Sequence, residues 1–193
     1  MSGNGTQPFA AERNSMVESQ LRHRGIRDER LLAAMSKVPR HEFVNEQNWN
    51  EAYADHPIPI AEQQTTSQPY MIAAMIQAAQ IKPEDRVLEI GAGSGYQTAL
   101  LAELASQVFA VERYASLAEA AQKTLGRLGY RNAKIVTGPA NPGTPVMRLR
   151  NALQAFNSSP FECGKSVQSD YMEIARPVPL SRELPSHLHV IGN

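Results

Sequence analysis

Three short runs of apolar residues, separated by segments with helical spacing, dominate the middle of the sequence. The runs cover residues 87–90, 107–112 and 133–137 and are rich in Val, Ile and Leu. Continuous apolar runs of this length indicate strands that are buried on both faces. Because these strands alternate with helices, the pattern predicts an α/β chain with a doubly wound parallel sheet.

Five other segments place apolar residues three and four positions apart, which is the spacing of an amphipathic helix. Gly25 and Pro39 mark the ends of the first two helices, and Pro69 suits the first turn of the third. Ser116 and Glu119 have the spacing of a capping box for the last. The predicted helices cover residues 10–25, 28–39, 70–80, 97–105 and 116–129. In the third helix we expect four residues to pack inward: Met71, Ile72, Met75 and Ile76.

A glycine-rich loop joins the first strand to the helix that follows it. Gly91, Gly93 and Gly95 allow the backbone to turn tightly and approach a ligand, and the start of the helix offers unpaired N–H groups. Glu112 ends the second strand about 20 residues after the first glycine, where a carboxylate can accept both hydroxyls of a ribose. The pattern predicts a nucleotide-like cofactor, although Gly-x-Gly-x-Gly matches the dinucleotide fingerprint Gly-x-Gly-x-x-Gly imperfectly. The simpler alternative is a tight turn followed by a solvent-facing acid.

Composition narrows the class of protein. The 193 residues are 42% hydrophobic, which fits one globular domain or one domain with a tail. Lys plus Arg equals Asp plus Glu at 19 each, so bulk charge gives no reason to expect a nucleic-acid or membrane partner. The single cysteine, Cys163, excludes an internal disulfide, and no metal-ligand spacing is found. We expect a cytoplasmic protein, a monomer, with no bound metal.

The region before the third helix differs from the rest. Residues 41–68 are polar, and Pro57 and Pro59 fix an extended path for the backbone. A long ordered loop ahead of a cofactor-binding fold is a candidate substrate lid.

Several segments together carry a resemblance to one family. They run in the same order from about Met16 to Gly138 and include Met16-Val17-Glu18, Val38-Pro39-Arg40-His41, Pro57-Ile58-Pro59-Ile60, Gln64-Thr65-Thr66-Ser67-Gln68-Pro69-Tyr70 and the glycine loop from Arg86 to Tyr96. On these segments the chain resembles protein-L-isoaspartate O-methyltransferase. Many methyltransferases share the glycine loop, whereas the Val-Pro-Arg-His and Thr-Ser-Gln-Pro-Tyr segments are characteristic of this family.

The resemblance implies a fold, a cofactor and a reaction. It implies a Rossmann-like domain that uses S-adenosylmethionine to methylate the α-carboxylate of L-isoaspartyl residues in damaged proteins and peptides. The ester then closes to a succinimide, whose hydrolysis returns some normal aspartate. The substrate carboxylate is already ionised at neutral pH and the sulfonium is already an activated methyl donor, so no strong general base is required.

The resemblance also assigns roles to individual residues. The active-site serine of the family corresponds to Ser67, whose hydroxyl can donate to the substrate carboxylate; the alternative role for Ser67 is a helix N-cap ahead of Pro69. The residues implied in cofactor binding are Glu89, Gly91, Gly93, Gly95 and Glu112, and those implied in substrate binding are Pro59, Ile60, Thr65 and Thr66. The family usually has a β-branched apolar residue at the position of Thr66.

The family pattern stops after Gly138. There the family has Gly-Asp-Gly, with the aspartate on the adenine amino group, and then further strands, whereas this chain continues Gly138-Pro139-Ala140-Asn141. Residues 139–193 hold seven of the 13 prolines and only scattered apolar residues, which disfavours a packed core. We therefore expect a mobile leader at 1–9, a methyltransferase domain at 10–138 and a divergent, poorly ordered tail at 139–193. The sheet would be incomplete, with its first strand on an open edge.

Two accounts of the tail are open. One is a shift of reading frame after about Gly138; the other is a replacement in which residues 167–174 or 188–191 supply strands. The function has corresponding alternatives. The chain could be a truncated or frame-shifted, catalytically impaired remnant that still binds cofactor, or, with less support, a nucleotide-binding oxidoreductase.

Overall fold

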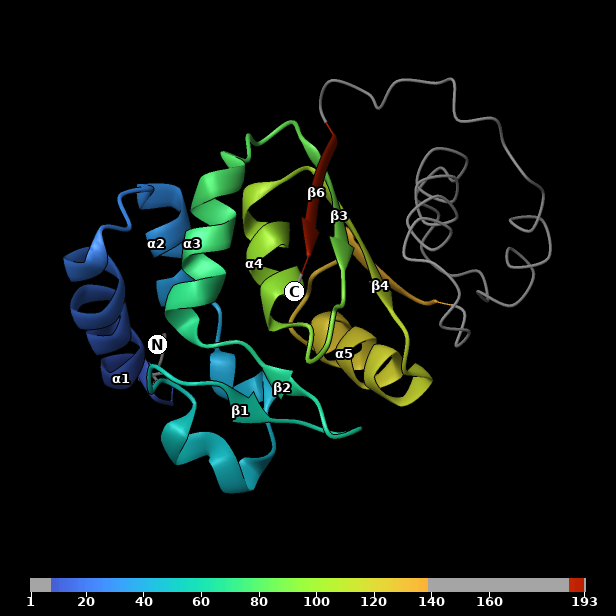
Figure 1. Ribbon diagram of the computed structural model, residues 1–193, viewed down its shortest axis with the longest axis horizontal. Helices are drawn as coiled ribbons and strands as arrows, with labels where there is room; N and C mark the ends of the chain where they lie inside the picture. Colours follow the sequence, from blue (N-terminus) through green and yellow to red (C-terminus); the bar gives the residue numbers. More distant parts are fainter. Residues whose placement is uncertain (1–7, 139–187, 193) are drawn as a thin grey trace, which may run out of the picture.

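A computed structural model describes residues 8–138 and 188–192, which form an α/β structure around a parallel sheet (Figure 1). The sheet has the order β5-β4-β3-β6, and all its pairings are parallel. Its strands are β3 (Arg86–Ile90), β4 (Gln107–Glu112), β5 (Ala133–Thr137) and β6 (Leu188–Gly192). The interior residues of β3 and β4 are buried, as expected for strands that are covered on both faces. The parallel sheet and its first three strands confirm the prediction.

The open edge expected at the first strand is wrong, because β6 occupies it. Leu188 pairs with Arg86, and Gly192 pairs with Ile90 at the other end of the ladder. At the start of β3, His189 Nε2 lies 2.7 Å from Asp85 Oδ2. The structure therefore has the replacement strand at residues 188–191. The other candidate strand, at 167–174, and the expected poor order of the tail at 139–187 lie outside the described residues.

Three helices pack around the sheet: α3 (Pro69–Ala79), α4 (Tyr96–Leu104) and α5 (Ala115–Arg127). Both α4 and α5 contact β4 and β5, and α3 contacts β6. Every residue of α4 except Glu103 is buried, because α2 (Glu29–Lys37) covers the side that the sheet does not. None of the helices in the described part of the chain has the length and apolar character needed to cross a membrane.

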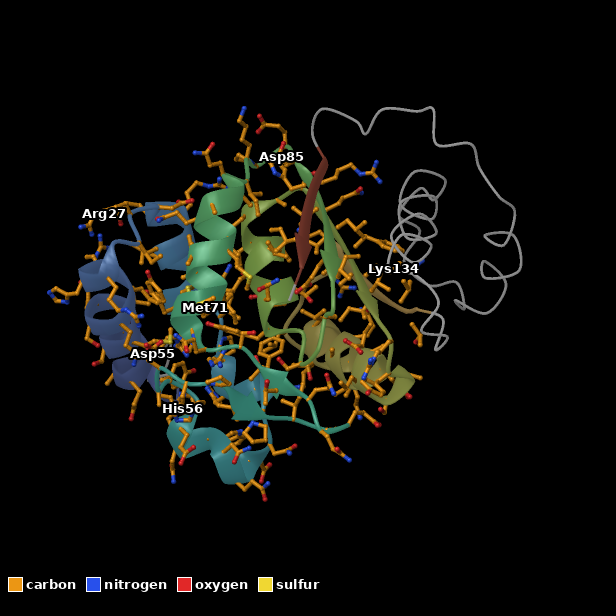
Figure 2. The ribbon with its side chains drawn as sticks, in the orientation of Figure 1. Arg27, Asp55, His56, Met71, Asp85 and Lys134 are labelled. Carbon is orange, nitrogen blue, oxygen red and sulfur yellow. The ribbon has the colours of Figure 1, made fainter. Side chains whose placement is uncertain are left out.

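One side chain of α3 points the other way from the prediction. Met71, which is labelled in Figure 2, is 48% exposed, whereas Ile72 and Ile76 are buried. The buried stripe of α3 follows Pro69, Ile72, Ala73 and Ile76, a helical spacing that leaves Met71 on the solvent side.

The first predicted helix is present but is not uniform. It consists of α1 (Ala10–Ser15), a π-helical turn η1 (Met16–Leu21) and a 3₁₀ turn η2 (Arg22–Arg24), and it ends at Gly25 with φ 94°. The wider turn brings Met16, Val17 and Leu21 into the core together. A hydrophobic pattern alone does not distinguish such a π turn from an α-helix.

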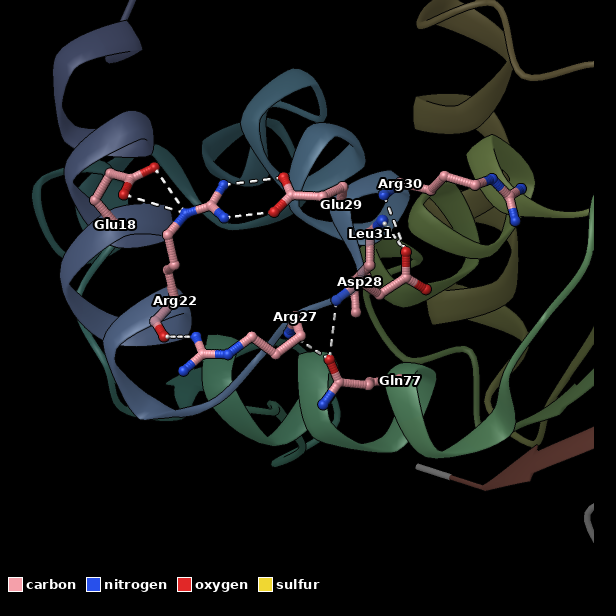
Figure 3. A network of polar contacts seen from close by, with 8 residues as sticks. All are labelled: Glu18, Arg22, Arg27, Asp28, Glu29, Arg30, Leu31 and Gln77. Carbon is pink, nitrogen blue, oxygen red and sulfur yellow. Dashed lines mark hydrogen bonds and ion pairs between the residues drawn. The ribbon is translucent and has the colours of Figure 1, made fainter.

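Polar contacts fasten these first helices to α3 (Figure 3). Gln77 Oε1 accepts hydrogen bonds from the backbone N–H groups of Arg27 (2.6 Å) and Asp28 (3.1 Å). The Asp28 side chain caps α2 by accepting from the N–H groups of Arg30 and Leu31. The segment between η2 and α2 is thereby held against α3.

The predicted lid region is ordered and compact. It contains two 3₁₀ helices, η3 (Arg40–Phe43) and η4 (Glu46–Glu51), followed by a short antiparallel hairpin of β1 (Ile58–Pro59) and β2 (Thr65–Thr66). Phe9 packs beside His41, Trp49 and Tyr53, with ring centroids 4.8–6.2 Å away. Phe9, the last residue of the expected leader, thus packs against this region. Residues 1–7 lie outside the described range.

The predicted helix cap at Ser116 is wrong, and the alternative role of Ser67 as a cap is not found either. Helix α5 begins at Ala115 with Tyr114 as its N-cap, so Ser116 lies inside the first turn, and its hydroxyl donates to Glu62 instead. The N-cap of α3 is Gln68, without a side-chain capping bond, so Ser67 lies one residue ahead of the cap position. The N-cap of α5 thus lies two residues before Ser116, and the N-cap of α3 lies one residue after Ser67.

Candidate functional site

The glycine loop forms the centre of the candidate site, at the carboxyl end of β3. Gly91, Gly93 and Gly95 have φ values of 89°, 54° and 85°, a region that residues with a Cβ rarely adopt. The backbone N–H groups of Gly91 and Ala92 both donate to Val111 O, which anchors the loop to the end of β4. The loop therefore runs directly into the buried helix α4 in a fixed conformation.

Glu112 lies beside this loop at the end of β4. Its Oε2 accepts from the Gly93 N–H at 2.9 Å, and its Oε1 accepts from the Tyr114 N–H at 3.0 Å. The residue is buried, with 5% of its surface exposed. Each carboxylate oxygen can accept more than one hydrogen bond, so both keep capacity for a ligand hydroxyl. The structure thus brings the predicted acid and the predicted glycines together.

A second acid, Glu89, lies deeper in the sheet. It is fully buried, and its Oε2 accepts from the Thr98 hydroxyl at 2.5 Å. Burial raises the pKa of Glu89 to about 8, partly opposed by the hydrogen bond from Thr98. Burial therefore favours the protonated form of Glu89 near neutral pH, a property that the sequence did not indicate.

Several buried polar atoms without a hydrogen-bond partner in the described part of the chain belong to Glu89 and its neighbour Gln97. Within the described residues, Glu89 Oε1 and both amide atoms of Gln97 are buried without a hydrogen-bond partner. Buried polar groups are normally paired, so unpaired ones at the base of a glycine loop indicate a site for a polar ligand group. The residues present therefore fit a ligand with a polar or charged end and a ribose.

The β1–β2 hairpin reaches over the glycine loop. Ile60 Cδ1 lies 3.7 Å from the position that a Cβ on Gly93 would occupy. At the tip of the hairpin, Glu62 Oε1 accepts from the Ser116 hydroxyl at 2.5 Å, which connects the hairpin to α5. Figure 1 shows the hairpin at the end of the sheet that carries the loop. The hairpin of the candidate lid thus lies against the glycine loop.

The predicted substrate residues are distributed along this hairpin. Pro59 and Thr65 are exposed, Ile60 is half-buried and Thr66 is buried. Ser67 follows β2 and is also half-buried. Ile60 is the member of this group that directly approaches the glycine loop.

Ser67 is connected to the glycine loop through a residue that the sequence did not single out. The carbonyl of Ser67 accepts from Arg40 Nη2 at 2.8 Å, and the Arg40 guanidinium lies 4.8 Å from the centroid of the Tyr96 ring. Tyr96 is the first residue of α4, directly after Gly95. The only signal for Arg40 was its place in the Val-Pro-Arg-His segment.

Residues 8–138 and 188–192 contain no cluster of three or more potential metal ligands. Pro139, at the position of the family's adenine-binding aspartate, lies outside the described residues. The chain of β5 is described up to Gly138, whose N–H donates to Glu112 O at 2.6 Å. The structure of the chain between β5 and β6 is therefore described only to this glycine.

Comparisons with known proteins agree on one family. The model of the family described as protein-L-isoaspartate(D-aspartate) O-methyltransferase matches residues 11–148. A protein-L-isoaspartate O-methyltransferase from Koribacter versatilis is 55% identical over 135 residues, covering 70% of this chain and 61% of the relative. One from a Synechococcus strain is 54% identical over 140 residues, covering 72% and 57%. The chain thus spans about three fifths of the length of these relatives.

Two solved structures that resemble this chain carry the same family name. A protein-L-isoaspartate O-methyltransferase superposes with a TM-score of 0.60 at 28% identity, covering 69% of this chain and 44% of that one. A Plasmodium falciparum protein assigned to the same activity, in complex with S-adenosyl-L-homocysteine, gives a TM-score of 0.55 at 28% identity, covering 64% and 62%.

Proposed function

The chain belongs to the protein-L-isoaspartate(D-aspartate) O-methyltransferase family, and on this basis we propose that it methylates the α-carboxylate of L-isoaspartyl residues in damaged proteins and peptides. The observation that carries the proposal is the pairing of the glycine loop with Glu112, beneath a hairpin that leads into Ser67. In this arrangement the proposed cofactor site and the proposed acceptor site would lie at the same end of the sheet.

The proposed cofactor is S-adenosylmethionine, which supplies an activated methyl group when bound. Gly91, Gly93 and Gly95 would lie against it, and Glu112 would accept its ribose hydroxyls. Glu89 and Gln97 have the orphaned atoms that its polar end needs. The bound S-adenosyl-L-homocysteine of the Plasmodium falciparum relative supports the same choice.

Catalysis in this proposal depends on positioning rather than on proton transfer. The substrate carboxylate is ionised at neutral pH, so no residue has to remove a proton from it. Ser67 would donate its hydroxyl to one carboxylate oxygen and orient the other toward the methyl group. Holding two reactants in line can contribute about 7–11 kcal/mol to lowering a barrier. The half-buried position of Ser67 leaves it accessible to a peptide while keeping it off the open surface.

The hairpin would hold the peptide. Pro59 and Thr65 are exposed on it, so they can contact a substrate backbone, while Ile60 would shield the reacting groups from water. Thr66 is buried and would support the hairpin rather than contact the peptide. We further propose that the chain acts as a cytoplasmic monomer without nucleic-acid or membrane partners, which its balanced charge supports.

The proposed domain division follows the same evidence. Residues 10–138 would form the methyltransferase domain; the family match covers 11–148, which includes nearly all of this range and the next ten residues. Residues 139–193 would remain a divergent tail from which β6 completes the sheet edge.

A second candidate function is a remnant that binds the cofactor but does not turn over. It is favoured by Pro139, which stands where the family pattern has its adenine-binding aspartate. Proline has neither a carboxylate nor an N–H to offer an adenine.

Methyl transfer to a matched peptide pair tests the proposal. Two peptides of the same sequence, one with L-isoaspartate and one with L-aspartate, are incubated with methyl-labelled S-adenosylmethionine and the protein. We expect base-labile methyl ester on the isoaspartyl peptide alone. Cofactor binding without ester on either peptide would instead support the remnant.

A further inference from the structure

Arg40 is a fully buried cation at the start of η3, with 0% of its surface exposed. One of its terminal nitrogens, Nη2, donates to the Ser67 carbonyl. The other two nitrogens of the guanidinium, Nε and Nη1, have no hydrogen-bond partner in the described structure. Burial lowers the pKa of Arg40, partly opposed by Tyr96, Tyr53 and Asp55, yet an arginine in a protein keeps its charge.

Core packing does not explain this residue. Burying a charge without full pairing opposes folding, and an apolar side chain of similar length usually fills such a position at equal or greater stability. Arg13 shows the contrast, because this second buried arginine donates from Nε to Ser36 O and from Nη1 to Tyr53 Oη. A gain in folding stability therefore does not explain why an arginine is buried at position 40.

The contacts of Arg40 join the two halves of the candidate site. Its hydrogen bond goes to Ser67, which ends the substrate hairpin, and its guanidinium lies against Tyr96, which begins the helix after the glycine loop. A planar guanidinium can donate in its plane and contact an aromatic ring with its face at the same time, whereas an ammonium group cannot do both in a fixed geometry.

We propose that Arg40 is a positioning residue for methyl transfer: it fixes the Ser67 segment relative to the glycine loop, and so sets the distance and direction between the acceptor carboxylate and the methyl donor. This inference rests on the proposed function. Arg40 acts through the backbone of Ser67 and touches neither reacting group. Its loss should lower kcat while leaving cofactor affinity and peptide KM nearly unchanged.

Two substitutions at Arg40 test this role. Arg40→Met removes the charge and the hydrogen bond while keeping the length, and we expect kcat to fall roughly tenfold to a hundredfold, as for a small misplacement of reacting groups. Arg40→Lys can still donate to the Ser67 carbonyl and should recover part of the loss. Arg13→Met is the matched control, which should lower stability but leave kcat per folded molecule unchanged.

A double-mutant cycle with Ser67→Ala separates positioning from general destabilisation. Ser67→Ala keeps the backbone carbonyl that Arg40 contacts but removes the hydroxyl. If Arg40 acts through that hydroxyl, Arg40→Met should lower kcat little further in the Ser67→Ala background. Losses that multiply, or a kcat loss in Arg40→Met that matches only its unfolded fraction, would overturn the proposal.

Hydrogen exchange gives a readout that does not depend on activity. Arg40→Met should speed exchange of the amides at residues 65–68 while leaving those of β4 slow, and Arg13→Met should not affect 65–68. If the parent transfers no methyl group, the proposed function fails and this measurement alone decides whether Arg40 holds the segment. Unchanged exchange at 65–68 in Arg40→Met would contradict the inference.

Discussion

The carboxylate of Glu112 accepts a hydrogen bond from the backbone N–H of Gly93 at 2.9 Å. This contact joins the end of one strand to the loop that follows its neighbour, so the acid and the glycines form one rigid unit. The second oxygen of Glu112 is held in the same way by the N–H of Tyr114. The unit therefore has its orientation before any ligand binds, which reduces the entropy that binding must overcome.

Glu112→Gln should weaken the binding of S-adenosyl-L-homocysteine. The amide keeps one acceptor oxygen but presents an NH₂ group to the other N–H, so one loop contact and one ribose contact are lost. Each such hydrogen bond is worth about 0.5–3 kcal/mol, or roughly twofold to more than a hundredfold in affinity. Isothermal calorimetry measures the change. Glu84→Gln, at an exposed position, is the matched control. Equal affinities of the two variants for S-adenosyl-L-homocysteine would show that Glu112 does not contact it.

Ser67→Ala should lower kcat/KM for an isoaspartyl peptide while leaving the affinity for S-adenosyl-L-homocysteine unchanged. Ser67 does not cap α3, because the N-cap is Gln68 and no side-chain capping bond is made there. The substitution should therefore avoid the loss of about 1 kcal/mol that removal of a capping serine causes.

The control for Ser67 is Ser19→Ala, which removes an exposed hydroxyl bonded to Ser15 O, far from the loop in sequence. Steady-state kinetics at matched folded fraction compares the two. If Ser67→Ala reacts as fast as Ser19→Ala, the catalytic role of Ser67 is wrong.

Glu89 should make stability depend on pH. Its pKa is raised by burial from the ordinary value of 4.5 to about 8 in the folded chain, so the folded state holds this proton more tightly than the unfolded state. The contribution of protonated Glu89 is fully present below about pH 4.5 and is lost as pH rises through about 8. Between these limits the contribution of Glu89 to the free energy of unfolding falls by about 1.4 kcal/mol per pH unit.

Glu89→Gln removes the titration while keeping an acceptor for Thr98. The difference in unfolding free energy between parent and variant, measured by urea denaturation from pH 5 to 8, should move steadily in favour of the variant as pH rises. For the control Glu119→Gln, at an exposed position, the difference in unfolding free energy from the parent should not change with pH. A difference that stays flat for Glu89→Gln would mean that Glu89 is ionised in the folded chain.

Removal of β6 should destabilise the sheet. A chain that ends at residue 187 loses the partner of β3 and the burial of Ile191, which alone is worth about 1.5–3 kcal/mol. We expect a lower urea midpoint and faster exchange of the β3 amides. His189→Leu, which removes only the contact with Asp85, should have a smaller effect on β3. Unchanged β3 protection in the shortened chain would show that β6 does not pair there.

Much of the fold could be predicted because local signals were strong. The strands β3, β4 and β5 are apolar runs with polar or glycine ends, and Gly25 ends a helix because it adopts φ 94°. The same locality explains why Glu112 and the glycines could be paired, since both lie at the carboxyl ends of neighbouring parallel strands.

The features of the fold and the site that the sequence did not predict depend on contacts between distant parts of the chain. β6 was one of two candidate strands in a proline-rich region, and its pairing with β3 shows that it is one. Arg40 had no pattern around it to indicate a buried cation, because burial is decided by how η3, the Ser67 segment and Tyr96 meet. The raised pKa of Glu89 likewise follows from the depth of β3 in the sheet, which composition does not reveal.

A single-turnover experiment tests the central proposal most directly. The protein, in excess over methyl-labelled S-adenosylmethionine, is mixed with saturating isoaspartyl peptide, so that even slow chemistry becomes visible. The account predicts that the label moves to a base-labile ester on that peptide, that the matched aspartyl peptide takes up none, and that Ser67→Ala slows the transfer. Label that stays on the bound cofactor, with the isoaspartyl peptide unmodified, would contradict it.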